Sequence, residues 1–134
     1  MSSTITIPTY SLLVLILISI YFALANADAL CDDVNSNLLI PCQGFLMSGN
    51  DSPNTACCSG AQIIDKQFHE SGCSDREAIC LCLKNAAQTL PIDLQKAAKF
   101  PALCNLDYIS IDPNVDCSNH MLDPIAICHN MFKT

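Results

Sequence analysis

The sequence predicts an all-α domain of four short helices held together by disulfides, followed by an irregular C-terminal tail. Apolar residues recur at helical spacing in four segments, which turn-forming residues separate. Ten cysteines in a chain of 134 residues indicate a disulfide framework and an oxidising compartment. No periodic pattern continues beyond residue 103, and no repeat or linker divides the chain. We therefore expect one helical domain.

An uncharged apolar segment opens the chain. Residues 1–27 contain no Asp, Glu, Lys or Arg, and their apolar core ends shortly before Ala25-Asn26-Ala27. Small residues at Ala25 and Ala27 fit cleavage by signal peptidase. The apolar run of about 14 residues is shorter than the ~20 that cross a bilayer. We interpret residues 1–27 as a secretory signal and not a membrane anchor. Residues 28–134 are then the mature, soluble, extracellular domain, with residues 118–134 as a C-terminal extension.

The first helix of the mature domain is predicted over residues 30–48. Val34, Leu38, Cys42 and Phe45 fall on one helical face. Pro41 lies within this pattern and has no N–H for the helical hydrogen bond, so we expect a kink there.

The second helix follows a turn cluster at residues 49–53. We expect Ser52 to cap it, with Pro53 in the first helical position, and Ser71-Gly72 to end it. Its inward stripe consists of Cys57, Ala61, Ile64 and Phe68.

Two more helices are predicted before the tail. A capping box at Ser74 and Glu77 begins the third helix, which ends near residue 87. Asp93 begins a short fourth helix over residues 93–100, and Pro101 is expected to stop it. The inward face of the third helix carries Ile79, Cys82, Leu83 and Ala86.

The charge balance excludes several function classes. Six basic and thirteen acidic residues give a formal net charge of −7. Binding to nucleic acid, or strong binding to anionic membranes, requires clustered cations. His69, His120 and His129 are not spaced as metal ligands, and no phosphate loop or nucleophile elbow is present. We expect no enzyme activity, no metal and no other cofactor.

The cysteine spacing constrains geometry but leaves the pairing open. Around a helix, Cys57 and Cys58 lie about 100° apart, and Cys80 and Cys82 lie about 200° apart. The second and third helices are therefore each expected to be bonded to two partners. Such crosslinks fix the distances between helices without side chains that fill the space between them.

Eight of the cysteines follow the order C…C…CC…CxC…C…C. This order resembles the plant eight-cysteine superfamily of non-specific lipid-transfer proteins, cereal amylase/protease inhibitors and seed storage albumins. Residues 39–46 (LIPCQGFL), 52–60 (SPNTACCSG) and 75–87 (DREAICLCLKNAA) are similar to motifs of the lipid-transfer branch. The resemblance covers residues 31–117 and implies four helices around an apolar cavity.

The resemblance also implies disulfide pairs. It implies Cys42–Cys57 and Cys58–Cys104. The other four cysteines pair as Cys31–Cys82 and Cys80–Cys117 in the type 1 subgroup, and as Cys31–Cys80 and Cys82–Cys117 in type 2. The apolar Leu81 between Cys80 and Cys82 is typical of type 2, which we slightly favour, although the surrounding motifs are similar to type 1.

Cys73 and Cys128 lie outside the eight-cysteine pattern. Because a secreted chain with an even number of cysteines is usually fully paired, we expect them to form a fifth bridge, which ties the C-terminal extension to the start of the third helix. A free reactive pair and an intermolecular bridge are the alternatives.

The resemblance implies that the cavity binds acyl chains of fatty acids or phospholipids. Apolar contacts discriminate poorly between headgroups, so we expect broad specificity. A filled core is the alternative for each residue that we expect to line the cavity. These residues are Leu38, Phe45, Ile64, Phe68, Ile79, Leu83, Phe100, Leu103, Leu106 and Ile109.

Two polar residues are candidates for contact with a lipid headgroup. Arg76 matches the Asp-Arg motif of the family. The macrodipole disfavours a cation in the first turn of a helix, so either an anionic ligand or a salt bridge to Asp or Glu would explain Arg76. Tyr108 is the only tyrosine of residues 28–134 and lies in a segment similar to the Pro-Tyr-x-Ile-Ser motif of the family.

The partners that we expect are fatty acids or phospholipids and, transiently, a membrane, with the protein itself a monomer. The main alternative function is inhibition of digestive hydrolases, and a lipid-dependent signalling role is another. An inhibitor of trypsin-like enzymes needs a basic residue on an exposed loop. Five of the six basic residues fall instead in predicted helices, namely Lys66, Arg76, Lys84, Lys96 and Lys99. Asn50 begins a glycosylation motif whose use Pro53 should lower.

Overall fold

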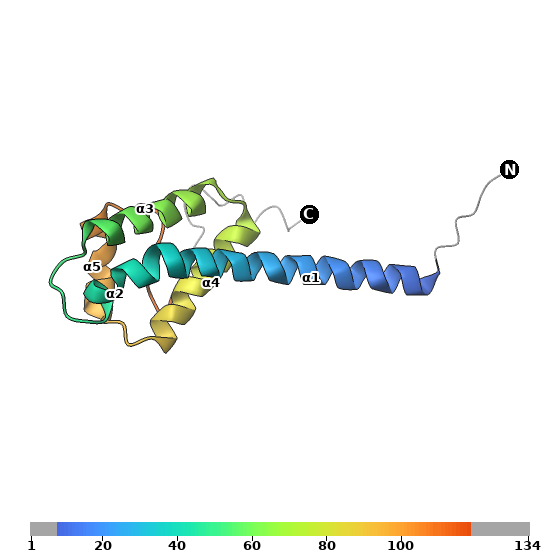
Figure 1. Cartoon of the computed structure of the whole chain (residues 1–134), viewed down its shortest axis with the longest axis horizontal. Helices are drawn as coiled ribbons and strands as arrows, with labels where there is room; N and C mark the ends of the chain where they lie inside the picture. The colour runs from blue at the N-terminus through green and yellow to red at the C-terminus, as the bar shows by residue number, and fades with distance from the viewer. Residues whose placement is uncertain (1–7, 119–134) are drawn as a thin grey trace.

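A computed structural model describes residues 8–118 of the chain (Figure 1). Three segments, α1 (Thr9–Val34), the π-helix η1 (Asn35–Leu39) and α2 (Ile40–Leu46), follow one another as one rod. Three separate helices come next, α3 (Thr55–Glu70), α4 (Cys73–Thr89) and α5 (Leu94–Cys104). Residues 105–118 form an irregular tail, and the described part contains no strand. The predicted fold of four disulfide-linked helices and an irregular tail is confirmed.

The rod begins much earlier than the predicted residue 30. In Figure 1 its N-terminal half projects away from the other helices. Val34 is the first fully buried residue of α1, and the apolar side chains before it are largely exposed. By length and composition this segment could cross a membrane, a test that a signal sequence near an N-terminus also meets. The part of the rod that packs in the bundle therefore begins near Leu30.

A π-helix directly precedes Pro41, where we expected a kink. The N–H of Ile40 donates to the carbonyl oxygen of Asn35, five residues back, and α2 starts with Pro41 in its first turn. In an α-helix the carbonyl of Asn37 would accept from residue 41, but proline has no N–H. The π-helical turn holds one more residue than an α-helical turn, so hydrogen bonds before Pro41 span five residues instead of four.

The rod and α3 make their closest approach at Gly60. A Cβ on this residue would overlap the backbone carbonyl oxygen of Asn37. Gly60 is buried in the middle of α3, where glycine costs about 1 kcal/mol relative to alanine in helix propensity. The helix therefore carries glycine here for contact with η1.

The helix starts differ from two of our predictions. The side chain of Asn54, and not Ser52, caps α3 by accepting a hydrogen bond of 2.8 Å from the N–H of Cys57. The N-cap of α4 is Gly72, so Ser74 already lies inside the first turn and the predicted capping box is wrong. α5 begins one residue after the predicted start, and Asp93 caps it, because its carboxylate accepts from the N–H groups of Gln95 and Lys96.

The predicted end of the last helix at Pro101 is also wrong. Pro101 lies inside α5, which continues to Cys104 and ends at Asn105 in the left-handed conformation. Gln62 of α3 donates a hydrogen bond of 2.8 Å to the carbonyl oxygen of Cys104. The Cys58–Cys104 disulfide holds the same turn against α3. These contacts compensate for the single helical hydrogen bond that the proline removes.

A buried carboxylate anchors the tail to α3. Asp65 is only 7% exposed and accepts hydrogen bonds from three successive backbone N–H groups. The donors are Asp107, Tyr108 and Ile109, at 3.2, 2.8 and 3.0 Å. With the backbone fixed in this way, the side chains of Leu106, Ile109 and Ile111 are buried. The sequence analysis missed Asp65, although a carboxylate directly beside the apolar stripe of a helix was a visible signal.

Four disulfides join the described elements. Cys42–Cys57 and Cys58–Cys104 are as implied by the resemblance. The other two are Cys31–Cys82 and Cys80–Cys117, so the type 2 pairing that we inferred from Leu81 is wrong. Leu81 is exposed, so its polarity has no bearing on which cysteine faces the rod and which faces the tail. Cys73 is disulfide-bonded, but its predicted partner Cys128 lies outside the described residues, and that bridge stays a prediction.

The close approach at Gly60 predicts a large cost for one added methyl group. Gly60→Ala should lower the free energy of unfolding by about 3 kcal/mol, because α3 or η1 must move away. Guanidinium unfolding with the disulfides intact measures this change. Gly72→Ala is the control, with no atom near its Cβ position, and should cost less than about 1 kcal/mol. Equal losses in the two variants would contradict the proposed contact.

The Asp65 anchor predicts a second stability difference. Asp65→Asn should lower the free energy of unfolding by about 2 kcal/mol, because an amide has one acceptor oxygen for three N–H donors and loses the charge. Asp112→Asn is a matched control, since Asp112 is exposed and accepts from a single backbone N–H. It should change the stability by no more than about 0.5 kcal/mol. A loss for Asp65→Asn no larger than that of the control would rule out the anchor.

Candidate functional site

The interior between the rod, α3, α4, α5 and the tail is apolar. Nine of the ten residues that we expected to line a cavity are buried there, with Leu103 the exception. Phe45 of α2 and Phe100 of α5 stack at its centre, with ring centroids 6.2 Å apart. The side chain of Leu103 is 48% exposed, so its predicted place in the interior is wrong. The buried nine are Leu38, Phe45, Ile64, Phe68, Ile79, Leu83, Phe100, Leu106 and Ile109.

The position of Leu103 follows from the continuation of α5. Had the helix stopped at Pro101, Leu103 would have been free to turn inward as the first residue of the tail. In the structure it lies one residue before Cys104, which is buried in the bond to Cys58. Successive residues of a helix differ by about 100°, so a buried Cys104 directs Leu103 away from the core.

This interior has little polar chemistry. Asp65 is the one buried charged residue among residues 8–118, and backbone donors satisfy its carboxylate. Within the same residues no buried side-chain N or O atom lacks a partner, and no cluster of ligating side chains could hold a metal. The chemistry that the interior offers is therefore burial of apolar surface.

Arg76 binds backbone carbonyl groups and not an acidic side chain. Its Nε donates a hydrogen bond of 2.7 Å to the carbonyl oxygen of Phe68, and its Nη2 donates to that of His69. The guanidinium carbon also lies 5.8 Å from the centre of the Phe68 ring. Arg76 thus caps the last turn of α3, where the macrodipole favours a cation. The predicted salt bridge to Asp or Glu is not among the ion pairs of the described residues.

Tyr108 lies at the same end of α3. Its ring is half-buried and stacks on the imidazole of His69, with centroids 4.3 Å apart and an angle of 16° between planes. Its backbone N–H binds Asp65. Arg76 contacts Phe68 and His69, and Tyr108 contacts His69. Both predicted headgroup residues therefore lie at the same end of α3. The sequence analysis assigned no role to His69.

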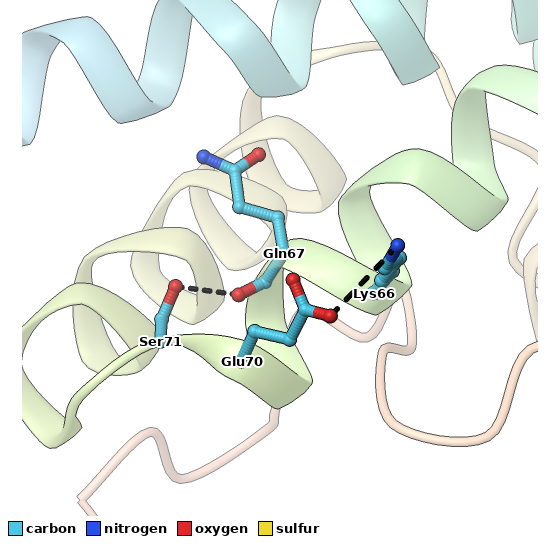
Figure 2. A network of polar contacts seen from close by, with 4 residues as sticks. All are labelled: Lys66, Gln67, Glu70 and Ser71. Atoms are coloured by element: carbon cyan, nitrogen blue, oxygen red, sulfur yellow. Dashed lines mark hydrogen bonds and ion pairs between the residues drawn. The ribbon is translucent and has the colours of Figure 1, made fainter.

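Two pockets open at the surface, and Val34, Leu39 and Ala86 of the apolar interior line one of them. One, of about 200 Å³, lies between the rod and α4 and includes the Cys31–Cys82 disulfide. The other is an open depression of about 500 Å³ along α3, lined by Ile63 and four polar residues. Figure 2 shows those four, with the Lys66–Glu70 ion pair at 3.8 Å and the Ser71 hydroxyl donating to the Gln67 carbonyl oxygen. Neither pocket includes a residue that we predicted to contact lipid.

The sequence is similar to known proteins over the segment that forms these helices. The profile of the protease inhibitor/seed storage/LTP family matches residues 31–117. A non-specific lipid-transfer protein of Pinus taeda is 37% identical over 90 residues, which cover 66% of this chain and 71% of the relative. Non-specific lipid-transfer protein 2 of Solanum chilense is 41% identical over 96 residues, which cover 69% and 80%.

Solved structures of a relative share the fold. Non-specific lipid-transfer protein 1 from barley, in complex with a lysophosphatidylcholine, superposes with a TM-score of 0.58 at 32% identity. The match covers 66% of this chain and 96% of the barley protein. A structure of post-translationally modified barley LTP1 matches equally well. With the family profile spanning the whole cysteine framework, the chain belongs to the protease inhibitor/seed storage/LTP family, and its relatives there are non-specific lipid-transfer proteins of plants.

Proposed function

We propose that residues 28–134 form an extracellular, non-enzymatic carrier that holds the acyl chain of a fatty acid or phospholipid between its helices. The observation that carries this proposal is the apolar interior, whose enclosing elements are joined by disulfides. The barley relative in complex with a lysophosphatidylcholine supports the same class of ligand. The carrier is a monomer that contacts membranes transiently.

The energetics of an apolar interior suit reversible transfer. Burial of each ligand methylene contributes about 0.8 kcal/mol relative to water. A bilayer offers the same gain, so movement of an acyl chain between protein and membrane is close to balanced. Such a balance allows both loading and release, and apolar walls accept chains of different lengths.

Arg76 and Tyr108 are proposed to orient the ligand headgroup. Two donors of Arg76 bind the end of α3, which fixes the guanidinium in place at the rim of the interior. The Tyr108 ring is held by His69 and its backbone by Asp65, so its hydroxyl group is also held in a fixed position. A phosphate or carboxylate at this rim would accept hydrogen bonds from both side chains.

Residues 1–27 are proposed to be the secretory signal, as their exposed apolar side chains in α1 support. Cleavage after Ala27 would remove the projecting part of the rod. It would leave Asp28 at a new helix start, where a carboxylate is favoured by the macrodipole. The packed part of the rod and the Cys31–Cys82 disulfide would remain.

Inhibition of trypsin-like digestive proteases has no support from the described residues. Basic residues that could enter a trypsin-like specificity pocket all lie in helices α3, α4 and α5 within residues 8–118. A helix does not present the extended backbone that a protease binds.

The carrier function predicts bound lipid in the purified protein. Organic extracts of the secreted chain should contain fatty acids or phospholipids by mass spectrometry. In solution, lysophosphatidylcholine should displace a fluorescent fatty acid. No lipid in the extracts together with no binding of the fluorescent fatty acid would overturn the proposed function.

The headgroup contact predicts a selective loss in one conservative variant. Tyr108→Phe keeps the ring that stacks on His69 and removes only the hydroxyl group. Affinity for lysophosphatidylcholine should fall about tenfold, the value of a hydrogen bond to a charged group. Affinity for a fatty acid methyl ester, which has no charged headgroup, should stay the same. Equal losses for both ligands would refute the headgroup role.

A further inference from the structure

The outward face of α5 carries two exposed leucines. Leu94 and Leu103 are 49% and 48% exposed, and Gln95, Ala98, Lys99 and Ala102 between them are exposed too. We call these six residues the α5 outer face. A single exposed leucine is ordinary in a soluble protein, but here two leucines and two alanines lie on the exposed half of an eleven-residue helix, with Leu94 and Leu103 about 180° apart at its two edges.

The same helix carries positive charge in an acidic protein. It contains Lys96 and Lys99 and no acidic residue, whereas the whole chain has a net charge of −7. In the other described helices acidic residues equal or outnumber basic ones, or charges are absent. Among residues 8–118, α5 is therefore the one helix with a net positive charge.

The two lysines differ in what they contact. The ammonium group of Lys96 donates a hydrogen bond of 2.7 Å to the carbonyl oxygen of Asn50 and lies 5.4 Å from the centre of the Phe45 ring. Lys96 is thus engaged within the protein. Lys99 is exposed, and the ion pair of the described residues, Lys66–Glu70, does not involve it. Lys99 is the cation that α5 presents to a partner.

The inner face of α5 closes the apolar interior. Ala97, Phe100 and Cys104 are buried, and Phe100 stacks on Phe45. This single helix therefore separates the proposed lipid site from solvent. Pro101 provides no N–H to the carbonyl of Ala97, so α5 lacks one of its internal hydrogen bonds at mid-length.

We propose that the α5 outer face docks the protein on phospholipid bilayers that contain anionic lipids. Leu94 and Leu103 enter the interfacial layer, and Lys99 contacts anionic headgroups, as in helices that lie in a membrane surface. The net negative charge opposes approach by other faces, so docking is oriented and transient. In Figure 1, α5 lies at the end of the bundle away from the projecting half of α1. This inference rests on the proposed lipid-carrier function.

Vesicle binding and lipid transfer test the apolar part of the proposal. The chain is purified from the medium of a secretory host, and its N-terminus is read by mass spectrometry. Leu94→Ser/Leu103→Ser should lower partition onto vesicles of equimolar phosphatidylcholine and phosphatidylglycerol about tenfold, and slow transfer of a pyrene-labelled phospholipid to the same degree. Leu81→Ser is the control, because Leu81 on α4 is 49% exposed and should leave both values unchanged.

Charge reversal tests the electrostatic part. Lys99→Glu should lower partition onto the mixed vesicles about tenfold at low salt and change partition onto pure phosphatidylcholine little. Lys66→Glu makes the same change in net charge on α3 and should have less than about a twofold effect. If Lys99→Glu and Lys66→Glu lose equal affinity, or the double leucine variant binds like Leu81→Ser, the proposal is overturned.

Fatty-acid binding measured without vesicles distinguishes the proposed docking surface from the proposed lipid-carrier function. Affinity for a fluorescent fatty acid in solution should be the same in all four variants and the parent chain. If the parent chain binds vesicles but not the fatty acid, the carrier function fails. If it binds the fatty acid while the α5 variants bind vesicles normally, only the docking surface fails.

Discussion

The four disulfides between described residues connect the described elements with the minimum number of bonds. Cys31–Cys82 joins the rod to α4, Cys42–Cys57 joins the rod to α3, Cys58–Cys104 joins α3 to α5, and Cys80–Cys117 joins α4 to the tail. Five units are thus linked by four bonds, each between a different pair. Crosslinks restrict the unfolded chain, so they stabilise the fold without requiring that side chains fill the interior tightly. A small domain that must keep room for a ligand needs stabilisation of this kind.

The helices themselves could be predicted because each depends on a local sequence pattern. Where each helix begins and ends depends on contacts with residues distant in the sequence. The apolar stripes of α3 and α4 lie inward as their spacing indicated. The π-helix before Pro41 and the continuation of α5 through Pro101 could not be read from the sequence. In both cases a proline breaks one hydrogen bond, and contacts distant in sequence decide whether the helix ends. Gly60 and the Cys58–Cys104 bond supply those contacts.

The candidate site shows the same division. Burial of nine apolar residues followed from helical periodicity. The prediction for Leu103 was wrong because the direction of its side chain depends on where α5 ends. The place of Arg76 in a first turn was correctly recognised as unusual, but its partners are carbonyl groups of α3 and not an acidic side chain. The position of Asp65 beside the apolar stripe of α3 signals burial but does not identify its partners, which are backbone groups that every sequence contains. Side-chain patterns do not encode such contacts.

The number of disulfides on each element also affects which element can move when the protein contacts a membrane. Among residues 8–118, the rod and α3 each carry two disulfide-bonded cysteines and α4 carries three, whereas α5 and the described part of the tail carry one each. An element with one covalent link can tilt about it without straining a second bond. The tail is further held by the three hydrogen bonds of Asp65. α5 is fixed at its start by a hydrogen bond from Asp93 to Leu46 and at its end by Cys104, with Pro101 weakening the helix between them. Of the described helices that enclose the interior, α5 is therefore the one with a single covalent link.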